Sequence, residues 1–184
     1  MSEDSDSELM RRVRGGRTSA LATLFERHHT RLYRYCLRMT GNRQTSEDLV
    51  QDVFMKMLKH KSQFRDDSVF MPWMYGIARN ACAMYWRRAA LHPVAESDLD
   101  SAPAEPQADD DHAGAQQADL MRRALLQLPA ARREVLVLSR YEFQTYEEIA
   151  HALGCSVSAV KVRAHRALKQ LGDIYRDLTG EVPT

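Results

Sequence analysis

Residues 92–117, HPVAESDLDSAPAEPQADDDHAGAQQ, hold few large apolar side chains and divide the chain into two parts. Proline, alanine and aspartate dominate this segment. Such a composition buries too little surface to offset the entropy that is lost on ordering. The segment is therefore predicted to be a flexible acidic linker. Each flanking part, residues 1–91 and residues 118–184, must then bury a core of its own.

Both flanking parts are predicted to be all-α, which gives two small helical domains joined by the linker. Strand signals are almost absent, since no hairpin dipeptide separates alternating apolar runs. Thr45 and Thr145 each stand three residues before an acid, as in the capping box that starts a helix. Pro72 suits the first turn of a helix that runs to about Arg88, and Pro129 opens another helix.

Charge is segregated along the chain, although the net charge is only +1. Residues 1–90 hold 16 Lys/Arg against 10 Asp/Glu, and residues 120–184 hold 10 Lys/Arg against 7 Asp/Glu. Residues 91–119 hold 8 acids and neither lysine nor arginine. Two basic blocks thus flank an acidic joint, and it is the charge of a segment that decides whether the segment binds a polyanion.

Several classes of protein are disfavoured. There is neither an apolar run of about 18 residues nor an apolar core in the acidic N-terminus, so we expect no membrane span and no secretory signal. The three cysteines are widely spaced, which argues against a disulfide framework and favours a cytoplasmic location. YEEIAH has Tyr146 where the zinc-protease motif has histidine. We expect no catalytic, metal or cofactor site and no small-molecule substrate.

The stretch TYEEIAHALGCSVSAVKVRAHRALKQL, from Thr145 to Leu171, is the most specific pattern in the chain. A short apolar helix face is followed by Gly154, where a helix must stop and turn, and by Ser156, a candidate N-cap. Such a helix-turn-helix places its second helix in the major groove, where Arg and Lys reach base edges or phosphates. The alternative is a basic, solvated helix of a bundle.

The second helix of this pattern has two faces. Its predicted core stripe comprises Val157, Val160, Ala164, Ala167, Leu168 and Leu171. Its candidate DNA-binding residues are Ser156, Ser158, Lys161, Val162, Arg163, His165, Arg166 and Lys169.

FRDDSVFMPWMYGIARNACAMYWRR, from Phe64 to Arg88, interleaves arginines with aromatic residues after a polar loop. Unpaired bases require a flat surface to stack on and positive charge for their backbone. The helical wheel puts Trp73, Met74, Ile77, Ala81 and Met84 on one side, and Tyr75, Arg79, Ala83 and Trp86 near the other, with Asn80 and Arg87 at its margin. The alternative for Tyr75 and Trp86 is packing against a neighbouring helix.

EDLVQDVFMKML, from Glu47 to Leu58, is amphipathic. Leu49, Val53, Phe54 and Met57 form an apolar stripe, and Asp48, Gln51, Asp52 and Met55 lie on the opposite face. Taken alone, this second face indicates a solvated surface.

Taken together, in the order in which they follow one another along the chain, the three stretches resemble the bacterial RNA polymerase sigma factors of the extracytoplasmic-function (ECF) group, in the sigma-70 family. The resemblance runs from about Ala20 to Leu171, apart from the linker. It implies that EDLVQDVF binds core RNA polymerase. It also implies that SQFRDDSVFMPWMYGIARNACAMYWRR opens and reads the −10 promoter element, and that the helix-turn-helix reads −35 duplex DNA.

The resemblance implies a role for particular residues. Asp48, Gln51, Asp52 and Met55 would contact core polymerase, where acids pair with arginines and methionine adapts to apolar surfaces. The −10 contacts would be Phe64, Ser68, Tyr75, Arg79, Asn80, Ala83, Trp86 and Arg87, with the loop from Ser62 to Met71 holding an extruded base. The −35 contacts would be the eight residues named for the helix-turn-helix.

The chain departs from the family pattern at two positions. Met84 stands where the family often has Asp, and Val162 replaces a hydroxyl, which should change the preferred −35 bases. The family is usually held inactive by an anti-sigma factor, often membrane-bound, although this chain would not itself be membrane-inserted. The alternative is a helix-turn-helix regulator that acts without polymerase and leaves the EDLVQDVF face unexplained.

Overall fold

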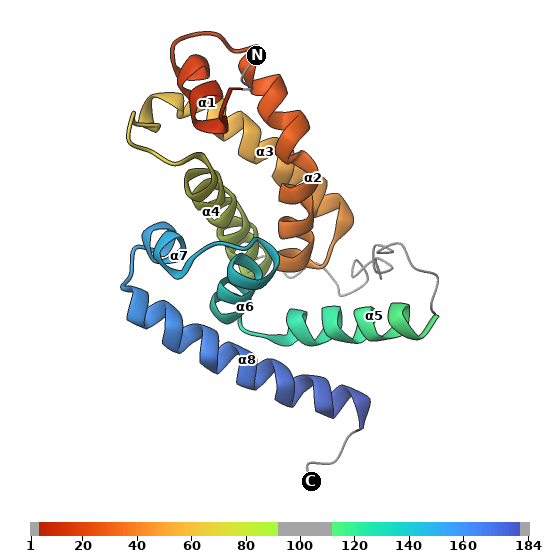
Figure 1. Ribbon diagram of the computed structural model, residues 1–184. Coiled ribbons are helices and arrows are strands. Elements are labelled where there is room, and N and C mark those ends of the chain that lie inside the picture. The colour runs from red at the N-terminus through yellow and green to blue at the C-terminus, as the bar shows by residue number, and fades with distance from the viewer. Residues whose placement is uncertain (1–3, 92–111, 181–184) are drawn as a thin grey trace. The chain divides into compact units, whose positions relative to one another are not determined.

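A computed structural model describes residues 4–91 and 112–180, and within these ranges every regular element is a helix (Figure 1). The chain divides into two compact units, residues 1–37 with 44–96 and residues 38–43 with 97–184. The prediction of an all-α fold in two parts is confirmed. The segment from residue 92 to residue 117 is predicted to be a flexible linker. Of these residues, 92–111 lie outside the described ranges.

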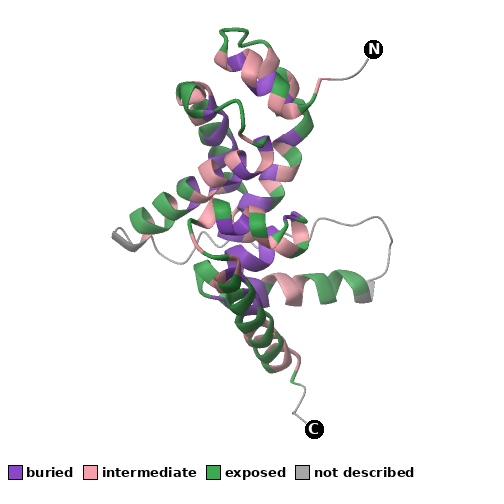
Figure 2. Cartoon of the chain, turned by 60° about the vertical axis from the view of Figure 1, so that its left-hand side comes forward, coloured by how far each residue is buried: buried purple, intermediate pink, exposed green. Residues whose placement is uncertain are grey.

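The first unit is built from α1 (Asp6–Arg14), α2 (Ala20–Thr40) as far as residue 37, α3 (Arg43–Lys59) from residue 44 on, the 3-10 turn η1 (Lys61–Gln63) and α4 (Phe70–Leu91). Its helices turn buried apolar stripes toward one another, and these stripes are purple in Figure 2. Apolar burial of this kind is the main force that holds such a unit together. The largest fully buried side chains of the unit are Tyr35, Tyr75, Phe64, Phe70, Met10, Leu24, Leu32, Met57 and Met74.

Of the two helix starts predicted from capping boxes, one is confirmed and one is wrong. Thr145 does cap a helix, since its hydroxyl accepts from the Glu148 amide at 3.2 Å and the Glu148 carboxylate accepts from the Thr145 amide at 2.8 Å. The start predicted at Thr45 is wrong, because α3 already begins at Arg43. Gly41, whose φ is 75°, makes the turn just before α3, so this turn rather than Thr45 sets the start.

The second unit is built from α5 (His112–Gln127), α6 (Ala130–Leu136), the π-helical turn η3 (Val137–Tyr141), α7 (Tyr146–Leu153) and α8 (Val157–Thr179). Helices α5, α6 and α7 all pack on α8. Pro129 directly precedes α6, as the sequence predicts. Helix α5 begins at His112, so residues 112–117, which the sequence pattern assigned to the linker, are helical.

The turn before α7 contains a strained residue. Phe143 is the one non-glycine residue with positive φ in the described part of the chain, at 54°. A residue with a Cβ is destabilised in this left-handed region by about 1–2 kcal/mol. The Phe143 side chain is 83% exposed, so burial of its ring does not offset the strain.

Replacing Phe143 with glycine is expected to stabilise the protein. Phe143→Gly should raise the free energy of unfolding by about 0.5–1 kcal/mol, because relief of the strain exceeds the extra unfolded-state entropy of glycine. Urea unfolding followed by far-UV circular dichroism measures this change. Phe143→Ala keeps the Cβ and should change stability less. A Phe143→Gly variant that is less stable than the wild type would show that the turn is not strained.

Candidate nucleic-acid and polymerase interfaces

Helices α7 and α8 form the helix-turn-helix that the sequence predicts. Gly154 ends α7 in the left-handed conformation, with φ 61° and ψ 38°. The Ser156 hydroxyl then accepts from the Ala159 amide at 3.2 Å and caps the first turn of α8. Val160, Ala164 and Ala167 are buried and fix the rotation of α8 about its own axis.

The face of α8 turned away from the core is basic and exposed. All eight candidate residues of the helix-turn-helix are solvent-exposed: Ser156, Ser158, Lys161, Val162, Arg163, His165, Arg166 and Lys169. Leu168, predicted to be in the core stripe, is exposed as well. The reason is that Ala167 already occupies the buried position, from which Leu168 is rotated by about 100°. Four cations and one valine therefore share a surface suited to a DNA groove.

Two residues predicted to contact −10 DNA belong to the core instead. Phe64 is fully buried and packs edge-to-face on Trp73, with ring centroids 5.1 Å apart. Tyr75 is buried against Tyr35, with centroids 5.2 Å apart. Neither ring offers a free face to a base, so their assignment as direct contacts is corrected.

The cause of this error is the rotation of α4. Its buried stripe runs through Met74, Tyr75, Ala78, Ala81 and Cys82. The helical wheel had placed the stripe about one residue away, with Trp73 and Met84 in it. Trp73 is half-buried and Met84 is exposed.

The C-terminal half of α4 keeps a surface of aromatic, amide and cationic groups. Trp86 is 36% exposed and packs edge-to-face on Tyr85, at a centroid distance of 5.3 Å. Asn80, Ala83 and Arg87 are exposed. Tyr85 is not among the residues predicted from the sequence, although its position beside Trp86 could have indicated that the two rings form a pair.

The other two predicted −10 residues are only partly accessible. Arg79 and Ser68 are both half-buried. The Ser68 hydroxyl accepts from the Arg65 amide at 3.0 Å, and the Ser68 amide donates to the Arg65 carbonyl at 3.2 Å. These two bonds close the turn that follows η1. Val69, next along the chain, is exposed.

On α3 the predicted polar face is exposed and its apolar face is buried. Asp48, Gln51 and Asp52 face solvent, and Met55 is 65% exposed. The Asp52 carboxylate lies 2.6 Å from the Lys56 ammonium, one helical turn away. The Gln44 side-chain amide donates to Asp48 at 3.3 Å. The face thus presents two carboxylates, an amide and an apolar tip.

An exposed aromatic residue on α2 packs against α3 and was not anticipated. Phe25 is partly exposed and stacks on His29, with centroids 4.9 Å apart and planes 8° from parallel. Its ring also packs edge-on against Phe54 of α3 at 4.9 Å. Nothing local to EDLVQDVF indicates this contact, because it joins two different helices.

Within residues 4–91 and 112–180, no three His, Cys, Asp or Glu side chains are placed to hold a metal ion. None of the helices described there has both the length and the apolarity that crossing a membrane requires.

Comparison with known proteins identifies both units. The model of Sigma-70 region 2 matches residues 24–91, and the model of Sigma-70 region 4 matches residues 118–171. RNA polymerase sigma factor CarQ of Myxococcus xanthus is 33% identical, over 94% of this chain and 99% of its own length. ECF RNA polymerase sigma factor SigM of Mycobacterium tuberculosis is 31% identical, over 92% of this chain and 84% of its own length.

Two solved structures share the fold, at 23% sequence identity each. One is the sigma factor RpoE in complex with the anti-sigma factor NepR from Bartonella quintana, with a TM-score of 0.69 over 88% of this chain and 98% of that one. The other is CnrH in complex with the cytosolic domain of CnrY, with a TM-score of 0.73 over 97% of this chain and 100% of that one.

The region 2 match spans α3 and α4, and the region 4 match spans the helix-turn-helix. A regulator that acts without polymerase would need only the second of these. The chain belongs to the extracytoplasmic-function group of the sigma-70 family, the RNA polymerase sigma factors that bind core polymerase and promoter DNA.

Proposed function

We propose that this sigma factor divides promoter recognition between its two units. The first unit docks on core RNA polymerase through α3 and opens the −10 element with α4 and the loop before it. The second unit anchors on −35 duplex DNA through α8. The observation that carries the proposal is the presence of three exposed faces of different chemistry, each lying opposite a buried stripe.

The α3 face suits a basic protein partner. Asp48 and Asp52 supply negative charge and Gln51 an amide, while Met55 adds an adaptable apolar contact. Complementary charge across an interface directs orientation and excludes wrong partners. Phe25 of α2, which is exposed and packs on Phe54 of α3, adds a second apolar group on this unit.

The α4 surface suits an unpaired strand. Trp86 and Tyr85 offer rings for stacking, which is worth about 1–3 kcal/mol per base. Arg87 and Arg79 supply charge for the backbone, and Asn80 supplies donors and an acceptor for a base edge. Together with contacts from the Ser68 turn, these groups would recover the few kcal/mol that extrusion of a base costs.

The α8 surface suits a duplex. Its N-terminal turn carries Ser156 and Ser158, which can bond phosphate oxygens, and Arg166 lies on the exposed side farther along. Val162 offers an apolar contact to a thymine methyl where the family often has a hydroxyl. The preferred −35 bases should differ accordingly from those of relatives with a hydroxyl at this position.

The factor is proposed to act in the cytoplasm, without catalysis of its own. We further propose that an anti-sigma factor, associated with the membrane, holds it inactive by covering the faces of α3 and α8. Support comes from the two structural relatives, which were solved in complex with NepR and with the cytosolic domain of CnrY.

Charge reversal on α3 tests the polymerase contact. Asp48→Arg combined with Asp52→Arg should weaken binding to core polymerase by about 2–4 kcal/mol, because attraction to partner arginines becomes repulsion. Both side chains are exposed, so the fold should survive. A binding titration with labelled protein measures the effect. The matched control is Asp173→Arg with Asp177→Arg on α8, which changes the net charge equally beyond residues 118–171. Equal binding by the two double variants would refute docking through α3.

Alanine at Arg166 tests the duplex contact. Arg166→Ala should cost about 1–3 kcal/mol on a −35 duplex if the guanidinium reads a base edge. Competition binding measures this on promoter fragments that the wild-type holoenzyme has selected from a randomised library. Arg176→Ala is the control on the same helix, because Arg176 pairs with Asp173 outside the matched region. Unchanged duplex affinity for Arg166→Ala would remove it from the interface.

Alanine at Trp86 and at Asn80 tests the opening surface. Either change should reduce permanganate reactivity of unpaired −10 thymines while sparing −35 duplex binding, because only the open strand stacks there. Met84→Ala is the control, since Met84 is exposed but turned about 200° around α4 from Trp86. Loss of isolated −35 duplex binding in Trp86→Ala would contradict the division of labour.

A further inference from the structure

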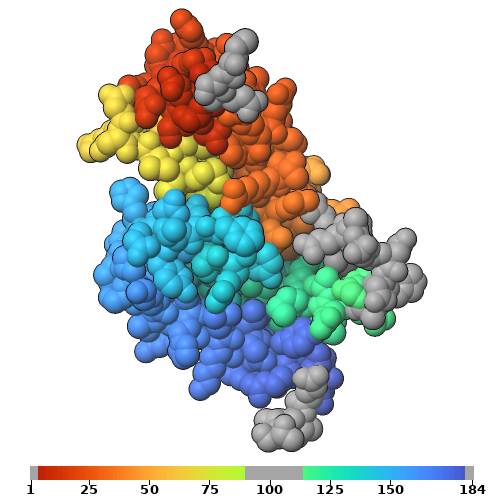
Figure 3. Space-filling model, viewed as in Figure 1, coloured from red at the N-terminus to blue at the C-terminus, as the bar shows by residue number. Residues whose placement is uncertain are grey.

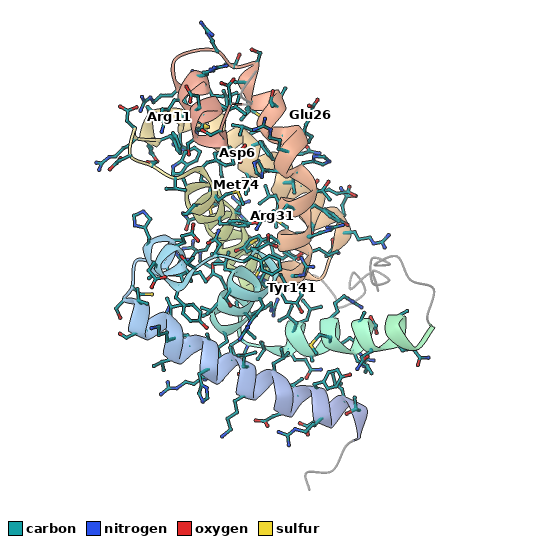
Figure 4. The ribbon with its side chains drawn as sticks, in the orientation of Figure 1. Asp6, Arg11, Glu26, Arg31, Met74 and Tyr141 are labelled. Carbon is teal, nitrogen blue, oxygen red and sulfur yellow. The ribbon has the colours of Figure 1, made fainter. Side chains whose placement is uncertain are left out.

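Helix α1 precedes the residues that match the family, which begin at residue 24, and none of the roles above uses it. It is nevertheless firmly attached to the first unit. Leu9, Met10 and Val13 are buried. The Asp6 carboxylate, labelled in Figure 4, lies 2.8 Å from the His28 ring and 3.0 Å from the Arg27 guanidinium of α2. Helix α1 is therefore a fixed support and not a frayed end.

The opposite side of α1 holds the loop formed by residues 64–69, the 64–69 loop. In Figures 1 and 3 this yellow segment lies against the red α1, and α1 packs on both η1 and α4 at its borders. Arg14 donates one bond to the Phe64 carbonyl at 2.8 Å and pairs with the Asp66 carboxylate. Arg11 donates to the Asp66 carbonyl at 3.2 Å.

The far end of the loop is held as well. The Phe70 amide donates to the Ser7 hydroxyl at 3.2 Å. Helix α1 thus forms hydrogen bonds with the loop at its beginning, at its tip and at its end. Each bond joins residues 50 or more positions apart in sequence. The turn inside the loop, which Arg65 and Ser68 close, lies between the first and the last of these hydrogen bonds.

Charge gives this attachment a further consequence. Asp66 and Asp67 are exposed acids. The −10 role proposed above would bring their loop close to the phosphates of an open strand. The Arg14 guanidinium pairs with Asp66 and offsets one of these charges. Arg12, by contrast, pairs with Asp4 at 2.5 Å and leaves the loop untouched.

We propose that α1 is a brace that holds the 64–69 loop in the shape that receives the extruded base, with Arg14 and Arg11 as its positioning residues. The inference rests on the proposed −10 role of the loop. A loop ordered in advance binds its ligand without the entropy cost of ordering at that moment. Loss of the brace should therefore lower the affinity for the open strand and reduce the preference for particular bases, without removing a direct contact to DNA.

Four variants separate this role from the alternatives. Arg14→Ala removes the carbonyl bond and the ion pair, and Arg14→Lys restores the charge without the two-pronged geometry. Arg12→Ala is the matched control on the same helix. Asp66→Ala, at a side chain that is 80% exposed, removes the ion pair without altering α1, so it remains informative if Arg14→Ala fails to fold.

The first measurement is hydrogen exchange of the free protein. In Arg14→Ala the amides of Ser68 and Phe70 should exchange about tenfold faster, while buried amides of α2 and α3 stay unchanged. Arg12→Ala should leave all of them unchanged. Unchanged loop exchange in Arg14→Ala would show that the loop does not depend on the brace.

The second measurement uses holoenzyme assembled from core polymerase and each variant. Its probe is a short single-stranded oligonucleotide with randomised central bases, whose bound pool is sequenced. Arg14→Ala should lose about tenfold in affinity for the selected strand, the effect of one charge-assisted hydrogen bond, and should flatten the base preference. Arg14→Lys and Asp66→Ala should each show a smaller loss, and Arg12→Ala should match the wild type.

The dependence of binding on salt decides how Arg14 acts. The slope of log affinity against log salt concentration is measured in Arg14→Ala combined with Asp66→Ala, which removes both charges of the ion pair together. For a positioning residue this slope should be the same as in the wild type. A slope reduced by about one would mean a direct phosphate contact and would overturn the proposal. Retained base preference in Arg14→Ala would also overturn it, while leaving the −10 role intact. A wild-type holoenzyme with no base preference would overturn both.

Discussion

Burial of one apolar stripe on each helix is the constraint on which the rest of this structure depends. Each unit is small and has to bury a core of its own, so every long helix must turn one face inward. The rotation of a helix about its axis then decides which side chains remain outside. Asp52 is exposed to solvent because Val53 and Phe54 are buried, and Arg166 is exposed because Ala164 and Ala167 are buried. The proposed function of this chain is therefore carried by the faces that packing leaves exposed.

In the proposed division of labour, the three faces differ because their ligands differ. Carboxylates with an exposed methionine suit a basic protein surface, paired rings with arginine suit an open strand, and cations on a capped helix suit a duplex. Helix α1 adds a fourth kind of contribution. Arg11 and Arg14 direct hydrogen bonds to the backbone and one carboxylate of the 64–69 loop, so in the proposal they shape a contact surface instead of forming one.

The sequence was most informative where local chemistry determines structure. Gly154 in the left-handed conformation and the caps at Thr145 and Ser156 define the helix-turn-helix, and each follows from a neighbour within four residues. It was least informative on α4, where apolar or aromatic residues occur on every side, so the wheel could not place Tyr75 in the core. The grip of α1 on the loop joins residues 50 or more apart, and no periodicity reveals such a contact.

Site-specific photo-cross-linking of one holoenzyme–promoter complex tests the central claim most directly. A photoreactive amino acid would replace Met55 on α3, Trp86 on α4 or Arg166 on α8, one position at a time. The account predicts cross-links to the largest polymerase subunits from position 55, to the open −10 strand from position 86 and to −35 duplex DNA from position 166. Cross-links from position 55 to DNA, or from positions 86 and 166 to the same promoter element, would contradict it.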